Sequence, residues 1–223
     1  METPKGILFD LDGTLLDTLE DLADSVNEVL RECGFPVHPV EAFRYFVGDG
    51  ASVLIERVLP EAHRDTATHA RCLARFRGVY ATRWNVKTKP YDGIIETLSE
   101  IRRQKLRMAV LSNKPHDATV QCVTELLRPV NFDAVQGQQE GVARKPDPGG
   151  ALAIARSLGL APGEFWYLGD TATDMQTASA AGMFAVGVAW GFRPREELWQ
   201  NGARVILETP GELVSLLERS RIT

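Results

Sequence analysis

Short apolar segments alternate with amphipathic helical patterns over the second half of the chain, and this alternation limits the folds available to it. Each apolar segment, often rich in β-branched residues, is followed by one whose apolar residues recur at helical spacing. The expected strands cover residues 106–112, 132–137, 164–169, 183–189 and 203–208, and the expected helices cover 93–104, 117–127, 149–158, 174–181, 195–201 and 210–219. Such alternation predicts an α/β fold with a doubly wound parallel sheet, that is, a Rossmann-like core.

The first part of the chain divides between a strand and a helical block. Residues 6–10 are a short apolar run followed by Gly13, as in a strand that is buried on both faces, so they belong with the sheet. Residues 18–87 show only helix-like patterns, and Thr18 with Asp21 three residues later has the spacing of an N-terminal capping box. We therefore expect an α/β core with an all-helical domain inserted after its first strand, at residues 1–17 with 88–223 and at residues 18–87 respectively.

Composition and charge exclude several classes of protein. Hydrophobic residues make up 44% of the 223 residues, enough for a full core, and the formal net charge of -5 shows no basic excess for binding nucleic acid. No apolar run approaches the roughly 20 residues that cross a bilayer, and the segment METPKG lacks the apolar centre of a signal peptide. The three cysteines are far apart and lack CxxC spacing, so we expect reduced packing residues and neither a disulfide nor a zinc site. We expect a cytoplasmic protein without a nucleic-acid or membrane partner, and no pattern indicates an oligomeric state.

Polar residues follow four of the expected strands. Alone, each set is explained more simply by turn or helix-capping residues. Ligands bind beyond the carboxyl ends of the strands in an open parallel sheet, so four such sets together predict one shared site. The residues, in chain order, are Asp10 and Asp12, then Ser112, Asn113 and Lys114, then Lys145, and last Asp170 and Asp174.

The carboxylates of this expected site repel one another unless a cation lies among them, and hard oxygen ligands of this kind suit Mg²⁺. A magnesium ion beside a lysine and small hydroxyl and amide donors is a receptor for a phosphoryl group. In such a site Asp10 has a second use, as the nucleophile that forms an aspartyl-phosphate. Asp12 could stay protonated in the carboxylate cluster and donate a proton to the leaving alkoxide. The residues therefore favour a Mg²⁺-dependent phosphatase.

Four motifs of the chain resemble those of the haloacid dehalogenase-like superfamily, and the likeness spans nearly the whole sequence. They are DxDGT after the first strand, Ser-Asn after the second, a later Lys-Pro and GDxxxD near the end. Within the superfamily, the stretches FDLDGTLLDT, VGDGASVLIERVL, LSNKP and ARKPDP are similar to the phosphoglycolate phosphatase group. The resemblance implies a Rossmann-like core with an inserted helical cap, here residues 18–87, that closes over the substrate and excludes water.

The resemblance also implies a role for each matching residue. Asp10 would be the nucleophile and a magnesium ligand, and Asp12 the acid/base, with its backbone carbonyl on the metal. Asp170 would be a further metal ligand, and Asp174 would hold the shell around it. The remaining core residues would bind the phosphoryl group: Ser112 and Asn113 through its oxygens, and Lys145 by neutralising both Asp10 and the phosphate.

Substrate choice depends on residues outside these motifs. The glycines of the VGDG stretch, with residues Gly48, Asp49 and Gly50, allow backbone N–H groups to approach a substrate, and Lys114 is a candidate contact for a substrate anion. The expected substrate is a small phosphorylated acid, 2-phosphoglycolate. A sugar-phosphate phosphatase, a pyrophosphatase and a phosphosugar mutase remain alternatives. A phosphonate hydrolase is disfavoured because residues 6–86 contain no lysine for a Schiff base. A phospho-acceptor signalling domain is disfavoured by the chain length and by the first-strand position of the nucleophile.

Overall fold

The chain divides into two compact units. The computed structural model describes residues 3–221, and one unit is Asp17–Lys89 while the other comprises the described residues on either side of it. We call them the helical unit and the core unit. The sequence-based division into core and cap is close to these bounds, and the roles attached to it stay predictions.

The core unit is built on one six-stranded sheet, as the sequence predicts. Every neighbouring pair is parallel, and the strands lie in the order β5-β4-β1-β6-β7-β8. Their bounds are β1 Gly6–Phe9, β4 Arg107–Pro115, β5 Ala134–Gln138, β6 Phe165–Gly169, β7 Phe184–Val188 and β8 Val205–Leu207. Strand β1 is buried along its whole length, which explains why its sequence is an unbroken apolar run.

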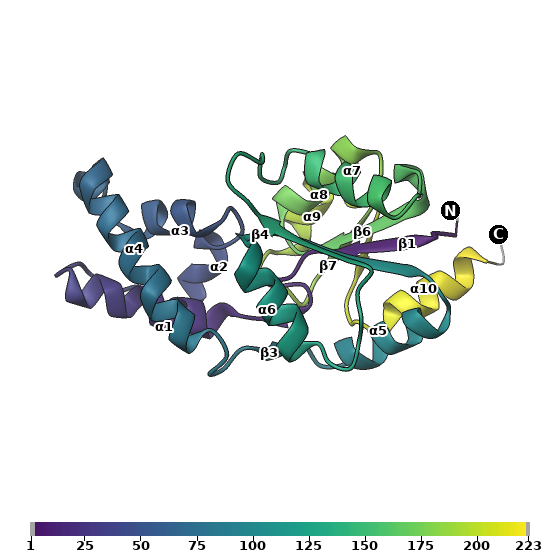
Figure 1. Cartoon of the computed structure of the whole chain (residues 1–223), viewed down its shortest axis with the longest axis horizontal. Helices are drawn as coiled ribbons and strands as arrows, with labels where there is room; N and C mark the ends of the chain where they lie inside the picture. The colour runs from purple at the N-terminus through teal and green to yellow at the C-terminus, as the bar shows by residue number, and fades with distance from the viewer. Residues whose placement is uncertain (1–2, 222–223) are drawn as a thin grey trace. The chain divides into compact units, whose positions relative to one another are not determined.

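Helices cover both faces of this sheet, so the core is doubly wound. Helices α5, α6 and α10 lie on one face, and α7, α8 and α9 lie on the other (Figure 1). Their bounds are α5 Ile94–Arg103, α6 His116–Leu126, α7 Gly149–Ser157, α8 Ala172–Ala181, α9 Arg195–Gln200 and α10 Glu212–Ser220. The hydrophobic core between sheet and helices includes Leu8, Ile154 and Phe165, each at most 2% exposed. The fold class expected from the strand–helix alternation is confirmed.

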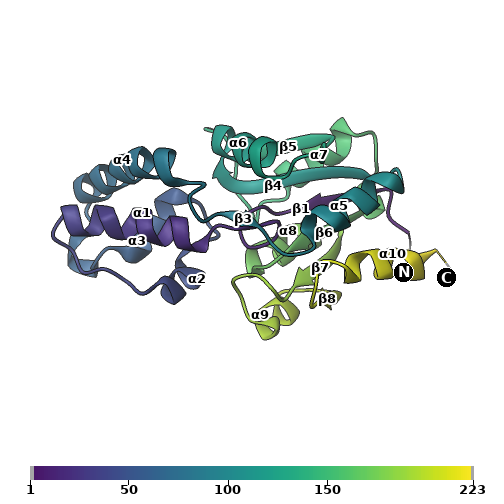
Figure 2. The same cartoon turned by 90° about the horizontal axis from the view of Figure 1, so that it is seen from below.

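The helical unit contains four α-helices within the described residues. They are α1 Leu19–Glu32, α2 Phe43–Phe46, α3 Ala51–Val58 and α4 Thr66–Arg83, and α1 and α4 lie side by side in both views (Figures 1 and 2). Two short strands that the sequence does not predict, β2 Leu16–Asp17 and β3 Lys89–Pro90, pair where the chain passes between the units.

The expected capping box at the start of α1 is wrong in its contacts. Thr18 occupies the N-cap position, but its hydroxyl accepts no hydrogen bond from the helix. The Asp21 carboxylate binds Lys87 and Thr88 at the far end of the helical unit instead. Asp21 therefore binds a donor 66 residues away in the sequence and does not form the local capping hydrogen bond.

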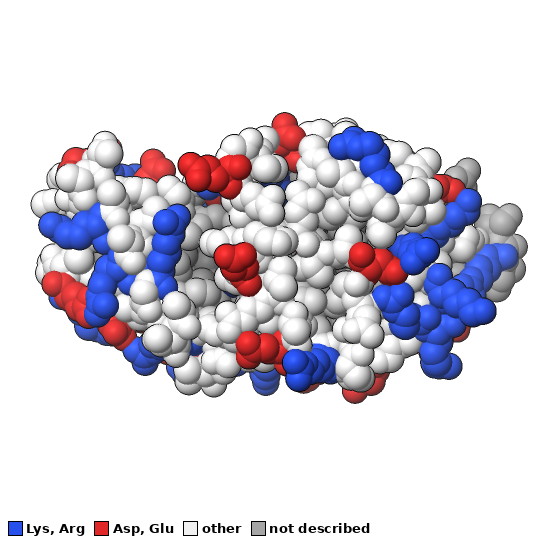
Figure 3. Space-filling model, in the orientation of Figure 1, with Lys and Arg blue, Asp and Glu red and all other residues white. Residues whose placement is uncertain are grey.

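The surface carries both signs of charge. Figure 3 shows acidic and basic side chains on the visible face of each unit, with basic side chains gathered at the right-hand end of the core unit. Among residues 3–221, no helix has the length and apolar character needed to span a bilayer.

Candidate active site

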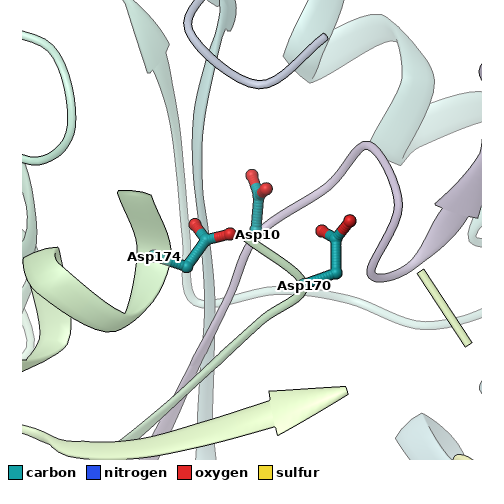
Figure 4. A group of neighbouring side chains, drawn as sticks. All are labelled: Asp10, Asp170 and Asp174. Atoms are coloured by element: carbon teal, nitrogen blue, oxygen red, sulfur yellow. The ribbon is translucent and has the colours of Figure 1, made fainter. Parts of the chain in front are cut away.

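Three buried aspartates gather at the carboxyl edge of the core sheet. Asp10 follows β1, Asp170 follows β6, and Asp174 lies in the first turn of α8. Each offers one carboxylate oxygen, and these oxygens lie within 4.8 Å of one another. Figure 4 shows the three side chains arriving from these separate elements. Asp10 is 6% exposed, and the other two are fully buried.

The strand order explains this convergence. Strands β4 and β5 follow β1 toward one edge of the sheet, and β6 then pairs with the other side of β1. In doubly wound sheets, ligands bind beyond the strand ends at such a reversal, which here lies between β1 and β6. The Asp10 N–H donates to the Leu168 carbonyl at 2.9 Å, so the strand pairing extends to the catalytic candidate itself.

Glycine is required where the DxDGT motif turns. Gly13 has a φ of 87°, and a Cβ added there would lie 2.3 Å from Oδ2 of Asp170. A side chain at this position would therefore displace a carboxylate of the cluster. This close approach explains the glycine of the motif.

Each of the other two aspartates is held by specific donors. Asp170 accepts hydrogen bonds from the Thr14 hydroxyl at 3.0 Å and from the Phe192 N–H at 2.8 Å. Asp174 closes the capping box of α8, where its Oδ2 accepts from the Thr171 hydroxyl at 2.7 Å and the Thr171 N–H at 3.1 Å. Both carboxylates are thus fixed in orientation before any ligand binds.

Lys145 is the cation that the structure places in this cluster. Its ammonium lies 2.7 Å from Oδ1 of Asp10 and 2.8 Å from Oδ1 of Asp174, and it also donates to the Leu111 carbonyl at 3.3 Å. Asn113 brackets its main chain, because the Lys145 N–H donates to Oδ1 of Asn113 at 3.0 Å and Nδ2 of Asn113 donates back to the Lys145 carbonyl at 3.2 Å. Asn113 therefore positions the lysine, while its expected contact with phosphoryl oxygens stays a prediction.

The electrostatics of the cluster favour an added cation. Burial raises the pKa of Asp10 well above its ordinary value, and the charge of Asp174 raises it further. Burial also raises the pKa of Asp170 to about 7. Burial lowers the pKa of Lys145, but the carboxylates of Asp10 and Asp174 outweigh this and hold that pKa well above its usual range. One ammonium balances only part of the charge of three carboxylates, and their oxygens are the donors that Mg²⁺ prefers. The cluster of Asp10, Asp170 and Asp174 therefore fits a divalent cation, and the assignment of individual aspartates as its ligands stays a prediction.

Comparison with known proteins identifies the family. The model of the haloacid dehalogenase-like hydrolases matches residues 7–188. The chain belongs to this family. A Pseudomonas putida relative named phosphoglycolate phosphatase is 35% identical over 85% of this chain and 71% of its own. A Mesorhizobium japonicum relative of the same name is 34% identical over 96% of this chain and 95% of its own.

Solved structures agree with this assignment of the fold. A crystal structure from Lactobacillus delbrueckii subsp. bulgaricus has a TM-score of 0.91 and 32% identity, over 97% of this chain and 99% of its own. The haloacid dehalogenase-like fold expected from the four motifs is therefore confirmed, and the chain is a hydrolase by family.

Asp12 forms an ion pair that the sequence does not predict. Its Oδ1 and Oδ2 accept from the Lys114 ammonium at 3.0 and 3.3 Å, and the two side chains are 14% and 4% exposed. The Lys114 N–H donates to the Ser112 hydroxyl at 3.2 Å, so the end of β4 is tied together locally. The proton-transfer role of Asp12, the phosphoryl contact of Ser112 and the substrate contact of Lys114 stay predictions.

The VGDG stretch lies in the helical unit, between α2 and α3. Gly48 and Gly50 have positive φ angles of 126° and 88°, a backbone conformation that glycine adopts readily. The Asp49 carboxylate accepts from Nη2 of Arg57 at 2.5 Å, and Nη1 of Arg57 donates to the Phe46 carbonyl at 3.1 Å. Arg57 thus contacts both Asp49 within the loop and Phe46 just before it. The role of the VGDG loop in substrate selection stays a prediction.

Sequence reasoning missed several residues that shape the site. The Tyr167 hydroxyl, fully buried in β6, donates to Oδ1 of Asp174 at 3.4 Å. A tyrosine among the apolar residues of FWYLG is the local signal that could have revealed it. Thr14 belongs to the DxDGT motif, but the motif alone does not reveal its contact with Asp170. Arg57 carries no comparable signal, because an arginine on a helix is common on its own.

Proposed function

We propose that the protein is a Mg²⁺-dependent phosphatase that hydrolyses a small phosphomonoester, 2-phosphoglycolate, through an aspartyl-phosphate on Asp10. The observation that carries the proposal is the buried Asp10, placed at the switch point of the sheet between the Asp170 carboxylate and the Lys145 ammonium. Membership of a hydrolase family and relatives named phosphoglycolate phosphatase support it. The proposal includes a cytoplasmic location, which agrees with three free cysteines.

Asp10 performs the first step. A carboxylate oxygen of Asp10 attacks the phosphorus, and the bond from phosphorus to the alcohol oxygen breaks. The leaving alkoxide takes a proton from Asp12, which enters this step as the carboxylic acid and not as the carboxylate paired with Lys114. Water then attacks the aspartyl-phosphate, gives its proton to Asp12 and releases inorganic phosphate with Asp10 restored. The carboxylates of Asp10 and Asp170 and the Asp12 backbone carbonyl would hold Mg²⁺, which would supply positive charge that offsets repulsion between the nucleophile and the phosphoryl oxygens.

Lys145 supplies a fixed positive charge for both steps. Its distance of 2.7 Å to Asp10 lets it neutralise the carboxylate, and charge that develops on the phosphoryl oxygens meets the same ammonium. Asp174 and Asn113 act through Lys145, since they hold its ammonium and its main chain. In the proposed site Ser112 and Asn113 also bind the phosphoryl group.

The preference for a phosphorylated acid rests on a second cation near the site. Lys114 is 4% exposed and lies at the end of β4, next to the phosphate-binding candidates. A carboxylate on the substrate would suit it. We assign substrate selection to Lys114 together with Gly48, Asp49 and Gly50 of the helical unit, which acts as the cap.

A substrate panel tests the proposal. Purified protein is assayed for phosphate release from 2-phosphoglycolate, a sugar phosphate, pyrophosphate and p-nitrophenyl phosphate, each with Mg²⁺ and with EDTA. We expect the highest kcat/KM for 2-phosphoglycolate, by at least about 10-fold, since a substrate carboxylate beside the Lys114 ammonium gains an ionic contact that a neutral group cannot make. EDTA should abolish release. Similar kcat/KM values for all four substrates would refute 2-phosphoglycolate as the preferred substrate but not the phosphatase activity. Phosphate release from none of the four would refute both. Transfer of the phosphoryl group to a sugar without release indicates the mutase.

A further inference from the structure

Two cysteines that are distant in the sequence meet inside the helical unit. Cys33 directly follows α1 at its C-cap, and Cys72 lies in α4, 39 residues later. Their Sγ atoms lie 3.7 Å apart. A disulfide has an S–S distance of about 2.05 Å, so the sulfurs are near the separation from which a bond can form. Sequence spacing alone does not predict this pair.

Ion pairs hold the two helices in register beside the sulfurs. Glu32 precedes Cys33, and Arg75 follows Cys72 by three residues. The guanidinium of Arg75 binds the Glu32 carboxylate twice, with Nε–Oε2 at 2.6 Å and Nη2–Oε1 at 2.7 Å. Bidentate pairs of this kind fix orientation as well as distance. The approach of the two sulfurs is therefore built into the contact between α1 and α4.

The two thiols differ in access to solvent. Cys72 is fully buried, whereas Cys33 is partly exposed. Burial raises the pKa of Cys72 to about 11, so its thiolate is scarce near neutral pH. A small oxidant from solvent therefore reaches the Cys33 thiol more readily than the buried Cys72 thiol.

We propose that Cys33 and Cys72 form a reversible disulfide that protects the exposed thiol from irreversible oxidation by a hydroperoxide. The Cys33 sulfur attacks hydrogen peroxide and becomes a sulfenic acid while the peroxide O–O bond breaks and one water leaves. The Cys72 sulfur then displaces the sulfenic hydroxyl, which leaves as a second water with the thiol proton. Two thiols are thereby oxidised and one peroxide is reduced, and a dithiol reductant reverses the bond.

Peptide mapping after peroxide treatment tests the pair directly. The full-length protein is exposed to hydrogen peroxide, its remaining thiols are alkylated under denaturing conditions, and the digest is read by mass spectrometry. We expect a peptide pair joined through Cys33 and Cys72, and a fall from three alkylated thiols to one per chain, because two of the three cysteines are consumed. Dithiothreitol should restore all three. A Cys33 that passes to sulfinic acid without any joined peptide overturns the proposal.

Three variants separate the pair from general thiol oxidation. In Cys72→Ser, Cys33 has no partner, so its sulfenic acid should react with dimedone and proceed to sulfinic acid. Cys33→Ser covers the case in which the buried Cys72→Ser change prevents folding, and it should leave Cys72 reduced. Cys122→Ser is the matched control, since Cys122 is also buried, its pKa is also raised to about 11 by burial, and it lies in the core unit. This control should form the Cys33–Cys72 bond as the parent does. A bond that depends on Cys122 contradicts the assignment.

Discussion

Both units of the molecule bury aspartates, but they surround them with opposite kinds of neighbour. In the helical unit, Asp21 is 2% exposed and accepts from the Lys87 N–H at 2.9 Å, the Thr88 N–H at 2.8 Å and the Thr88 hydroxyl at 2.8 Å. In the core unit, Asp10 lies within a group of three carboxylates. The first carboxylate meets donors, and the second meets like charges.

This difference separates a structural carboxylate from a reactive one. The charge of Asp21 is used within the fold, because its donors tie the first helix of the unit to its last segment. The Lys145 ammonium neutralises the charge of Asp10 only in part, because it also contacts the Asp174 carboxylate. Burial is common to both residues, so burial alone does not mark a site. The sign of the neighbouring groups does.

Asp10→Asn should give the largest effect, and it should lower kcat without lowering the stability of the fold. The amide cannot act as a nucleophile on phosphorus, so kcat should drop by at least about 10⁴-fold. The melting temperature should stay the same or rise, because the change removes a buried charge from among like charges. Steady-state phosphate release and thermal unfolding of the same preparation measure both. A variant that keeps kcat within about tenfold excludes Asp10 as the nucleophile.

Asp21→Asn should reverse that pattern. The asparagine Oδ1 can accept from the Thr88 donors, but its Nδ2 would take the place of the oxygen that faces the Lys87 N–H, so a charged acceptor is lost and two donors meet. We expect a loss of about 2–3 kcal/mol in the free energy of unfolding. Below the unfolding range, kcat should change less than about twofold, since Asp21 touches no residue of the proposed site. Urea unfolding gives the first quantity, and a kcat reduced as strongly as in Asp10→Asn would contradict the structural role.

The same contrast shows what the sequence could predict. Strand-end residues such as Asp10, Lys145 and Asp170 could be assigned to one site because parallel strands end at one edge, whatever their distance in the chain. The partner of Asp21 could not, since local spacing indicates a capping box while the real donors are 66 residues away. The Lys114–Asp12 pair is likewise long-range, since its members are 102 positions apart in the sequence. Contacts that depend on side-chain direction at the ends of elements carry no periodic signal.

A pH series without metal should test the electrostatic half of the comparison. Burial raises the pKa of folded Asp170 to about 7, whereas an unfolded aspartate titrates near about 3.9. Between these values the folded chain binds the additional proton, so this contribution to stability is fully present below about pH 4 and is lost as the pH rises through about 7. The free energy of unfolding in EDTA should therefore decline over this range, by up to about 1.4 kcal/mol per pH unit from this group.

The Asp170→Asn variant removes the group and should flatten that part of the curve, while Asp21→Asn should keep the parental slope although it is less stable. Added Mg²⁺ should oppose the decline, because the cation binds the deprotonated carboxylates and stabilises the folded state by mass action, about 2.7 kcal/mol at 100 times its dissociation constant. Its stabilising effect should grow as the pH rises toward 7.5 and should be absent in Asp170→Asn. Urea unfolding at matched ionic strength measures each curve. Equal slopes in the parent and Asp170→Asn would show that the carboxylate cluster is not the source of the pH dependence, and the core aspartates would then differ from Asp21 in position only.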